Sequence, residues 1–228
     1  PELRVDGLMT HLACADAADL ASTRKQLADF ERLSAQVRQA GFSPRVRHAA
    51  NSAAMLRLPA SQLDLVRSGI AVFGVHPCPD QPSKSQRAPK LKPVMRVLSE
   101  VVALRDLAAG DALGYGHSWR AQRPSRIATI PIGYADGYAR ALSNRGSVLI
   151  CGRRAPIVGN VSMALIMVDV TELGPVAVRD EVVVLGPQKG RLGEDAISAH
   201  ELADKTGTIA WECLTAISRR VPRFYRNP

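Results

Sequence analysis

Three of the chain's four tyrosines lie in one short region, and a phenol is a side chain that can move protons. Tyr115 stands in "GYGHSW", and Tyr134 and Tyr138 follow in "IPIGYADGYAR". Tyrosines among strands usually pack against neighbouring side chains, so core packing is the simplest interpretation. The glycines on both sides of Tyr115 favour a loop, where the hydroxyl is free to act as a base. A nucleic-acid stacking surface is the third alternative.

Polar residues also fall near the ends of predicted strands in the first third of the chain. His11, His48 and Arg67 would share one rim of a parallel sheet, which is where barrel enzymes place their catalytic residues. Each residue alone is an ordinary rim side chain. Their shared placement leaves both interpretations open.

The stretch "RHAANSAAMLRLP" offers a second kind of site. A helix that opens at Asn51 or Ser52 presents free backbone N–H groups, a hydroxyl and the positive end of a helix dipole, which suit a phosphate. An ordinary N-cap is the commoner use of Asn and Ser. Gly69, in "VRSGIAVFG", either lets a phosphate approach the backbone or forms a tight turn.

The elements that must position these residues fall into two parts. In residues 1–88, "VDGLMTHLA", "PRVRHAA" and "GIAVFGV" predict three strands, with a short helix at "NSAAMLRLP". A longer helix is predicted from apolar residues at helical spacing and a closing glycine: Leu20, Leu27, Phe30, Leu33, Val37 and Gly41. This alternation is the signature of a parallel α/β sheet. Three strands do not close a barrel, so this part is expected to be an incomplete domain.

A proline-dense polar stretch, "PCPDQPSKSQRAPKLKP", places a domain boundary near residue 88. Residues 89–228 then change to short Val- and Ile-rich runs separated by Gly, Asp and Asn, which predict a mostly antiparallel β domain. One helix is expected within it, opened by Ser198 with Glu201 as a capping box.

Composition limits the function classes. The 228 residues are 46% hydrophobic and 22% charged, and no run is long enough to span a membrane. The four cysteines are widely spaced and match neither a disulfide framework nor a metal site, which favours reduced thiols in the cytoplasm. The net charge of +9 raises nucleic acid as a partner, but the arginines are scattered. We expect no metal, no membrane and no nucleic acid.

The motifs as an ordered set resemble those of alanine racemase, a pyridoxal-phosphate enzyme. The matching stretches are "THLACAD", "RHAANSAAMLRLP", "VRSGIAVFGVHP", "LGYGHSW", "IPIGYADGYAR", "PIVGNVSM" and "GTIAWE…RVPR". The resemblance implies the last strands of a TIM-type β/α barrel in residues 1–88, followed by the β domain of that family in residues 89–228. It also implies a homodimer whose active sites use both chains.

The same resemblance implies a role for each candidate residue. Tyr115 matches the catalytic tyrosine, Arg67 the arginine that faces the cofactor's pyridine nitrogen, and His11 the histidine that links the two. Met163 and Tyr134 match substrate contacts. The residues implied at the cofactor are His48, Asn51, Ser52, Arg67, Gly69, Ile70 and Trp211, with Ser52, Gly69 and Ile70 at its phosphate.

The implied reaction interconverts L- and D-alanine and supplies D-alanine for peptidoglycan. It needs two bases on opposite faces of the substrate, which in the family are the tyrosine and a lysine that also binds the cofactor as an imine. None of the chain's six lysines lies in a matching context: Lys25, Lys84, Lys90, Lys92, Lys189 and Lys205. The chain is therefore expected to lack the N-terminal barrel segment and, by itself, to be inactive.

Two alternatives follow from departures in the motifs. Ser162, Ala164 and Trp211 stand where the family usually has Cys, Asp and Tyr, which raises a broad-specificity or serine racemase of the same fold. The missing lysine raises a non-catalytic module, either a truncated remnant that pairs with intact subunits or a basic nucleic-acid binder.

Overall fold

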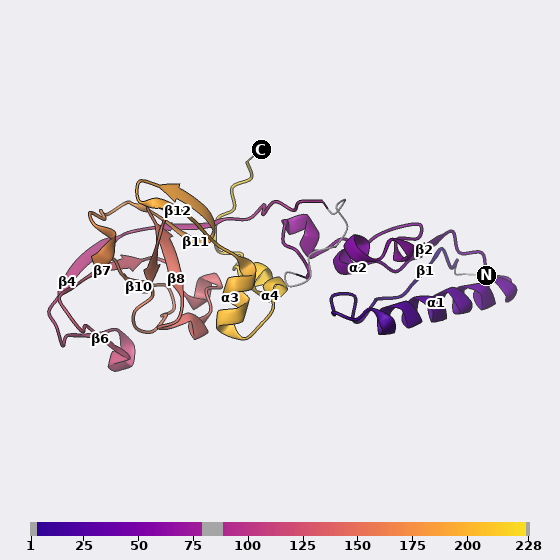
Figure 1. Ribbon diagram of the computed structural model, residues 1–228, viewed down its shortest axis with the longest axis horizontal. Helices are drawn as coiled ribbons and strands as arrows, with labels where there is room; N and C mark the ends of the chain where they lie inside the picture. Colours follow the sequence, from indigo (N-terminus) through magenta and orange to yellow (C-terminus); the bar gives the residue numbers. More distant parts are fainter. Residues whose placement is uncertain (1–3, 79–88, 227–228) are drawn as a thin grey trace. The chain divides into compact units, whose positions relative to one another are not determined.

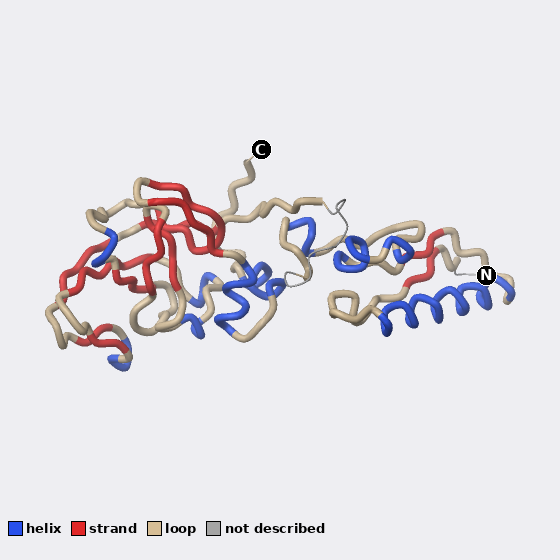
Figure 2. Tube along the Cα trace, viewed as in Figure 1, coloured by secondary structure: helices blue, strands red, loops and turns tan. Residues whose placement is uncertain are grey.

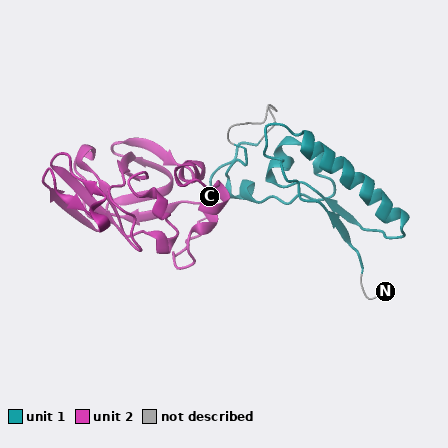
Figure 3. Ribbon diagram, turned by 90° about the horizontal axis from the view of Figure 1, so that it is seen from below, with its two compact units in different colours: residues 1–94 teal, residues 95–228 magenta. Residues whose placement is uncertain are grey.

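The computed structural model describes residues 4–78 and 89–226. The chain divides into two compact units, Pro1–Val94 and Met95–Pro228 (Figure 3). Each unit is described by itself. The predicted boundary near residue 88 lies outside the described residues.

Unit 1 is built on two short parallel strands. Strand β1 (Gly7–Met9) pairs with β2 (Val46–His48), and helix α1 (Ala21–Gln39) connects them (Figure 1). Helix α2 (Ser52–Arg57) follows β2 directly. Leu27 of α1 packs with Ala53 and Ala54 of α2 in one buried cluster. The core therefore lies where the two helices cover the ends of the strands.

Helix α1 confirms the predicted helix but only part of its predicted apolar stripe. Leu27 and Phe30 are buried, and the helix ends before Gly41, whose φ of +91° is readily adopted only by glycine. Leu33 is half exposed, so the apolar stripe is wider than the face that unit 1 buries.

The predicted third strand at "GIAVFGV" is wrong. Residues Ile70–Phe73 form a 3-10 helix that ends at Gly74 in the left-handed conformation. A second parallel pairing lies five residues before Ile70, where Leu65 forms a bridge with His48. The Arg67 N–H also donates to the Ala50 carbonyl at 2.9 Å. The prediction chose "GIAVFGV" because that run is apolar. The segment that pairs, "DLVR", is short and carries two charges, so it resembles a loop.

Unit 2 contains most of the strands, drawn red in Figure 2. Every strand pairing among its described residues is antiparallel. One sheet has the order β10-β7-β4, a second has β12-β11-β8-β9 with β3 against β11, and β5 pairs with β6. The strands are β3 (Val97–Glu100), β4 (Ala103–Leu107), β5 (Ala112–Leu113), β6 (Trp119–Arg120), β7 (Ser125–Ile130), β8 (Ser147–Ile150), β9 (Arg153–Pro156), β10 (Ile166–Asp169), β11 (Glu181–Gly190) and β12 (Gly193–Ile197). All four residues of β8 are buried, which identifies it as the centre of the core.

The expectation of one helix in unit 2 is also wrong, because two helices follow β12. Helix α3 (Ala199–Thr206) begins at the predicted N-cap, with the Ser198 hydroxyl accepting from the Glu201 N–H at 3.0 Å. The other half of the predicted capping box is replaced, because the Glu201 carboxylate accepts from Arg154 and Lys205. Helix α4 (Ala210–Ala216) carries Trp211. Among the described residues, no helix is both long and apolar enough to cross a membrane.

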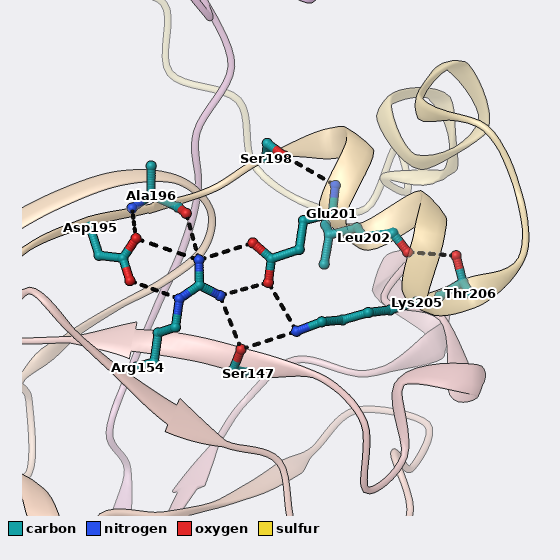
Figure 4. A network of polar contacts seen from close by, with 9 residues as sticks. All are labelled: Ser147, Arg154, Asp195, Ala196, Ser198, Glu201, Leu202, Lys205 and Thr206. Atoms are coloured by element: carbon teal, nitrogen blue, oxygen red, sulfur yellow. Dashed lines mark hydrogen bonds and ion pairs between the residues drawn. The ribbon is translucent and has the colours of Figure 1, made fainter. Parts of the chain in front are cut away.

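A network around Arg154 joins β9 and β12 to α3 (Figure 4). The Arg154 guanidinium contacts Asp195 at 2.7 Å and Glu201 at 2.6 Å, and Lys205 contacts Glu201 at 2.9 Å. The Arg154 hydrogen bond lowers the pKa of Asp195. Burial raises the pKa of Glu201, but the hydrogen bonds from Arg154 and Lys205 outweigh it, so that pKa is lowered as well.

These shifts predict an acid-sensitive contribution to the stability of unit 2. A carboxylate whose pKa is lower in the folded state stabilises the fold above its unfolded pKa, and the contribution disappears as the pH falls through the folded pKa. Replacing Arg154 with methionine should remove about 1 kcal/mol at neutral pH and much less at about pH 3. Urea unfolding at both pH values measures this, with Lys189→Met as the exposed control. An equal loss at both pH values would contradict the assignment.

Candidate active site

Arg67 is the centre of a polar cluster at the carboxyl ends of β1 and β2. Its Nη1 lies 2.6 Å from Nδ1 of His48, and its Nη2 lies 3.3 Å from Nδ1 of His11. The same Nη2 donates to the carbonyl oxygens of Thr10 at 2.9 Å and Ala49 at 3.2 Å. One guanidinium therefore joins the ends of both strands, and the structure brings together the three residues predicted to share this rim.

The contact with Arg67 assigns the tautomer of His48. A guanidinium has donors only, so Nδ1 of His48 must accept, and its proton must lie on Nε2. The ring then presents an N–H on its other side. Together with the Arg67 cation, this N–H suits a planar or anionic ligand.

The loop after β1 is held by Gln26 of α1, a residue that the sequence did not single out. Its Nε2 donates to the Thr10 hydroxyl and to the His11 carbonyl, both at 2.8 Å, and its Oε1 accepts from the Ala13 N–H at 3.2 Å. These bonds replace the strand pairing that ends at Met9. His11 is thus fixed by its backbone as well as by Arg67.

The segment around Ser52 fits a phosphate. Asn51 is the N-cap of α2 and accepts from the Ala54 N–H at 3.0 Å. The buried Ser52 hydroxyl accepts from the N–H groups of Gly69 at 2.8 Å and Ala71 at 3.3 Å. Between these two amides, the Ile70 N–H has no hydrogen-bond partner among the described residues. A free N–H beside a hydroxyl and a glycine is a suitable cradle for phosphate oxygens.

In unit 2, Tyr134 and Met163 lie side by side. The Tyr134 N–H donates to the Ser162 carbonyl at 3.1 Å, and the Ala135 N–H donates to the Met163 carbonyl at 3.0 Å. Gly133 permits this approach, because a β-carbon there would overlap the Ser162 carbonyl oxygen. Both side chains remain open to solvent, with 49% of Tyr134 and 60% of Met163 exposed.

Helix α4, which carries the partly buried Trp211, is tied to the Tyr134 turn at its end. The Ser218 N–H donates to the Asp136 carbonyl at 3.0 Å, and Nε of Arg220 lies 3.0 Å from the Asp136 carboxylate. Tyr138 belongs to the core at 2% exposure, and burial, with a smaller effect of Glu201, raises the pKa of its hydroxyl. A buried phenol of raised pKa is a packing residue and not a base.

Tyr115 stands apart from these contacts. It lies in a one-turn 3-10 helix (Tyr115–His117) between β5 and β6, and 77% of the residue is exposed. Tyr115 and Trp211 form no hydrogen bond with Tyr134 or Met163 within the part of the chain that the structure describes. The candidate residues thus fall into two groups in unit 1, the Arg67 cluster and the Ser52 segment, and three in unit 2: the Tyr134–Met163 pair, Trp211 on α4 and the Tyr115 loop.

Comparisons with known proteins agree on one family. Residues 94–225 match the family model "Alanine racemase, C-terminal domain", and residues 1–77 match "Alanine racemase, N-terminal domain". A curated alanine racemase from Sorangium cellulosum is 59% identical over 228 residues, which are 100% of this chain and 59% of that protein.

Solved structures give the same result. The alanine racemase from Bacillus anthracis with bound L-Ala-P has a TM-score of 0.88 at 36% identity, over 97% of this chain and 55% of that one. The alanine racemase from Bartonella henselae with covalently bound pyridoxal phosphate has a TM-score of 0.83 at 37% identity, over 97% of this chain and 56% of that one. The chain spans a little over half the length of these relatives.

Proposed function

The chain belongs to the alanine racemase family, and we propose that the protein containing it interconverts L- and D-alanine with pyridoxal phosphate as its cofactor. The observation that best supports this proposal is the Arg67 cluster, in which a cation and two imidazoles meet at the ends of two parallel strands. Beside it, the Ser52 hydroxyl and the Ile70 N–H, which has no partner among the residues that the structure describes, suit the cofactor's phosphate.

The position of each residue of this chain indicates the role that it would have in the reaction. The bound cofactor supplies an electron sink that acidifies the Cα–H of the amino acid. Arg67, held by His48, would face the pyridine nitrogen as a permanent donor, which leaves that nitrogen without a proton. The Tyr115 hydroxyl would take or return the Cα proton on one face. Its 77% exposure fits a side chain that acts across a homodimer contact.

The second base belongs on the opposite face. We propose that it is a lysine outside this chain, because none of the six lysines here lies in a sequence context that matches the family's catalytic lysine. Met163 and Tyr134, fixed side by side by two backbone hydrogen bonds, would contact the substrate at its entry.

The structure favours alanine over serine as the substrate. Ser162, one of the departures that raised a broader substrate range, uses its hydroxyl within its own turn. It donates to the Leu165 carbonyl at 2.8 Å and accepts from the Leu165 N–H at 3.1 Å. A hydroxyl engaged in this way adds no free polar group for a serine side chain. Turnover of the two amino acids by the same protein tests this preference.

The chain alone and the protein that contains it should behave differently. The isolated 228-residue chain, mixed with pyridoxal phosphate, should give no D-alanine, and borohydride reduction with mass spectrometry should find cofactor only at low levels spread over its exposed lysines. The protein containing the chain should give D-alanine and one lysine that carries the cofactor in about stoichiometric amount. D-alanine formed by the isolated chain and lost on mutation of one of its six lysines would place the second base in this chain. Absence of D-alanine from the containing protein would remove the proposed function.

A further inference from the structure

The loop that carries Tyr115 is held by two asparagine side chains. Nδ2 of Asn160 donates to the carbonyl oxygen of Tyr115 itself at 2.7 Å. Nδ2 of Asn144 donates to the carbonyl of Ser118 at 3.2 Å, three residues further on. Each end of the 115–118 turn therefore receives one amide donor from outside the hairpin.

These two asparagines belong to a braced platform. Oδ1 of Asn144 accepts from the Gly159 N–H at 2.6 Å, and the Ser143 hydroxyl accepts from the Val161 N–H at 2.9 Å. These bonds fix residues 143–144 to residues 159–161 independently of the contacts that either segment makes with the Tyr115 loop. Buried neighbours anchor this platform to the core, since Leu142 and Val161 are almost fully buried.

The loop needs such support because little else holds it. The flanking strands β5 and β6 have two residues each, and Gly114, Gly116 and His117 all have positive φ angles. The Tyr115 side chain is too exposed to anchor the turn by packing. Within the loop, one hydrogen bond runs from the His117 N–H to the Gly114 carbonyl at 3.2 Å.

We propose that Asn160 and Asn144 are positioning residues that fix the Tyr115 loop, so that the phenol is presented in one orientation for proton transfer. The expected effect on catalysis rests on the proposed function. The contact between the two asparagines and the loop does not depend on it. Because the loop is already ordered, the reaction does not lose conformational entropy by ordering it at each turnover.

Aspartate is the sharpest replacement at both positions. Asn160→Asp and Asn144→Asp keep the size of the side chain and remove the N–H donor. At position 144 the remaining oxygen still accepts from the Gly159 N–H, and aspartate tolerates the local φ of +55°. Gln122→Glu is the matched control, because it adds the same charge to an exposed amide that bonds Arg120 and not the Tyr115 loop.

The first measurement is amide hydrogen exchange in the 228-residue chain. In each aspartate variant the His117 amide should exchange about 5- to 10-fold faster, while the amides of β8 and all amides of Gln122→Glu keep their rates. Unchanged exchange at His117 in both variants would overturn the proposal. Faster exchange in β8 as well would overturn it too, since the asparagines would then support the whole unit.

The second measurement uses the protein that contains this chain. Each aspartate variant should lower kcat for alanine by about 10-fold and change KM by less than about 2-fold, because the proton donor is misplaced and not the substrate contacts. Loss through KM alone would overturn the positioning role. If the unmodified protein does not racemise alanine, the proposed function fails while the exchange result still decides the loop contact.

Discussion

Replacing Tyr115 with phenylalanine is expected to lower kcat for racemisation by about 10²- to 10⁴-fold, the range that a general acid–base group contributes. The change removes one hydroxyl from a side chain that is 77% exposed, so folding should be unaffected. L- and D-alanine have equal free energies, and kcat/KM must therefore fall equally in both directions. Racemisation rates measured from each enantiomer test this expectation.

Solvent exchange separates a lost base from a damaged site. If Tyr115 serves one face only, Tyr115→Phe should still exchange the Cα hydrogen of one enantiomer in deuterated water, without inverting it. Tyr225→Phe is the control, because Tyr225 lies near the C-terminus with 92% of the residue exposed. Equal loss of exchange for both enantiomers would show that Tyr115 supports the site in another way.

The sequence predicted elements whose signals are local. Helix α1 itself and the caps at Asn51 and Ser198 depend on residues a few positions apart, and the structure confirms all three. Helix α4 escaped prediction because it has seven residues and an Ile209 N-cap that makes no side-chain hydrogen bond. Strand β12 escaped because it is short and polar and is defined by its pairing with β11.

In the candidate site, too, the sequence predicted residues with local signals and missed those defined by tertiary contacts. The sequence singled out His11, His48 and Arg67 by their places at strand ends, and the structure joins them in one cluster. The sequence contains no signal for the amide of Gln26, which holds His11, or for that of Asn160, which holds the Tyr115 loop. Gln26 bonds the backbone 15 residues away, and Asn160 bonds a carbonyl 45 residues away. Such contacts depend on tertiary packing, and no spacing rule marks them in a single sequence.

The Arg67 side chain serves both the fold of unit 1 and the proposed chemistry. A planar fork with fixed directions can reach His48, His11 and the Thr10 carbonyl at once. A lysine carries the same charge on one nitrogen and cannot span these acceptors. The geometry of the fork, more than its charge, therefore orders the ends of β1 and β2.

Arg67→Met is expected to lower racemisation by about 10²-fold or more, and to reduce the free energy of unfolding by about 1 kcal/mol because partly buried acceptors lose their donor. Arg67→Lys should lose nearly as much activity. Nitrogen NMR should find the His48 proton on Nε2 in the unmodified chain and on either nitrogen in Arg67→Met.

Arg47→Met is the matched control for these variants. Arg47 precedes His48 on β2 but points to Glu31 at 2.9 Å and Asp64 at 3.6 Å, so its loss should affect stability and leave the His48 tautomer unchanged. If Arg67→Lys retained full activity, charge alone would be sufficient at this position. The two histidines would then serve the fold and not the orientation of the cation.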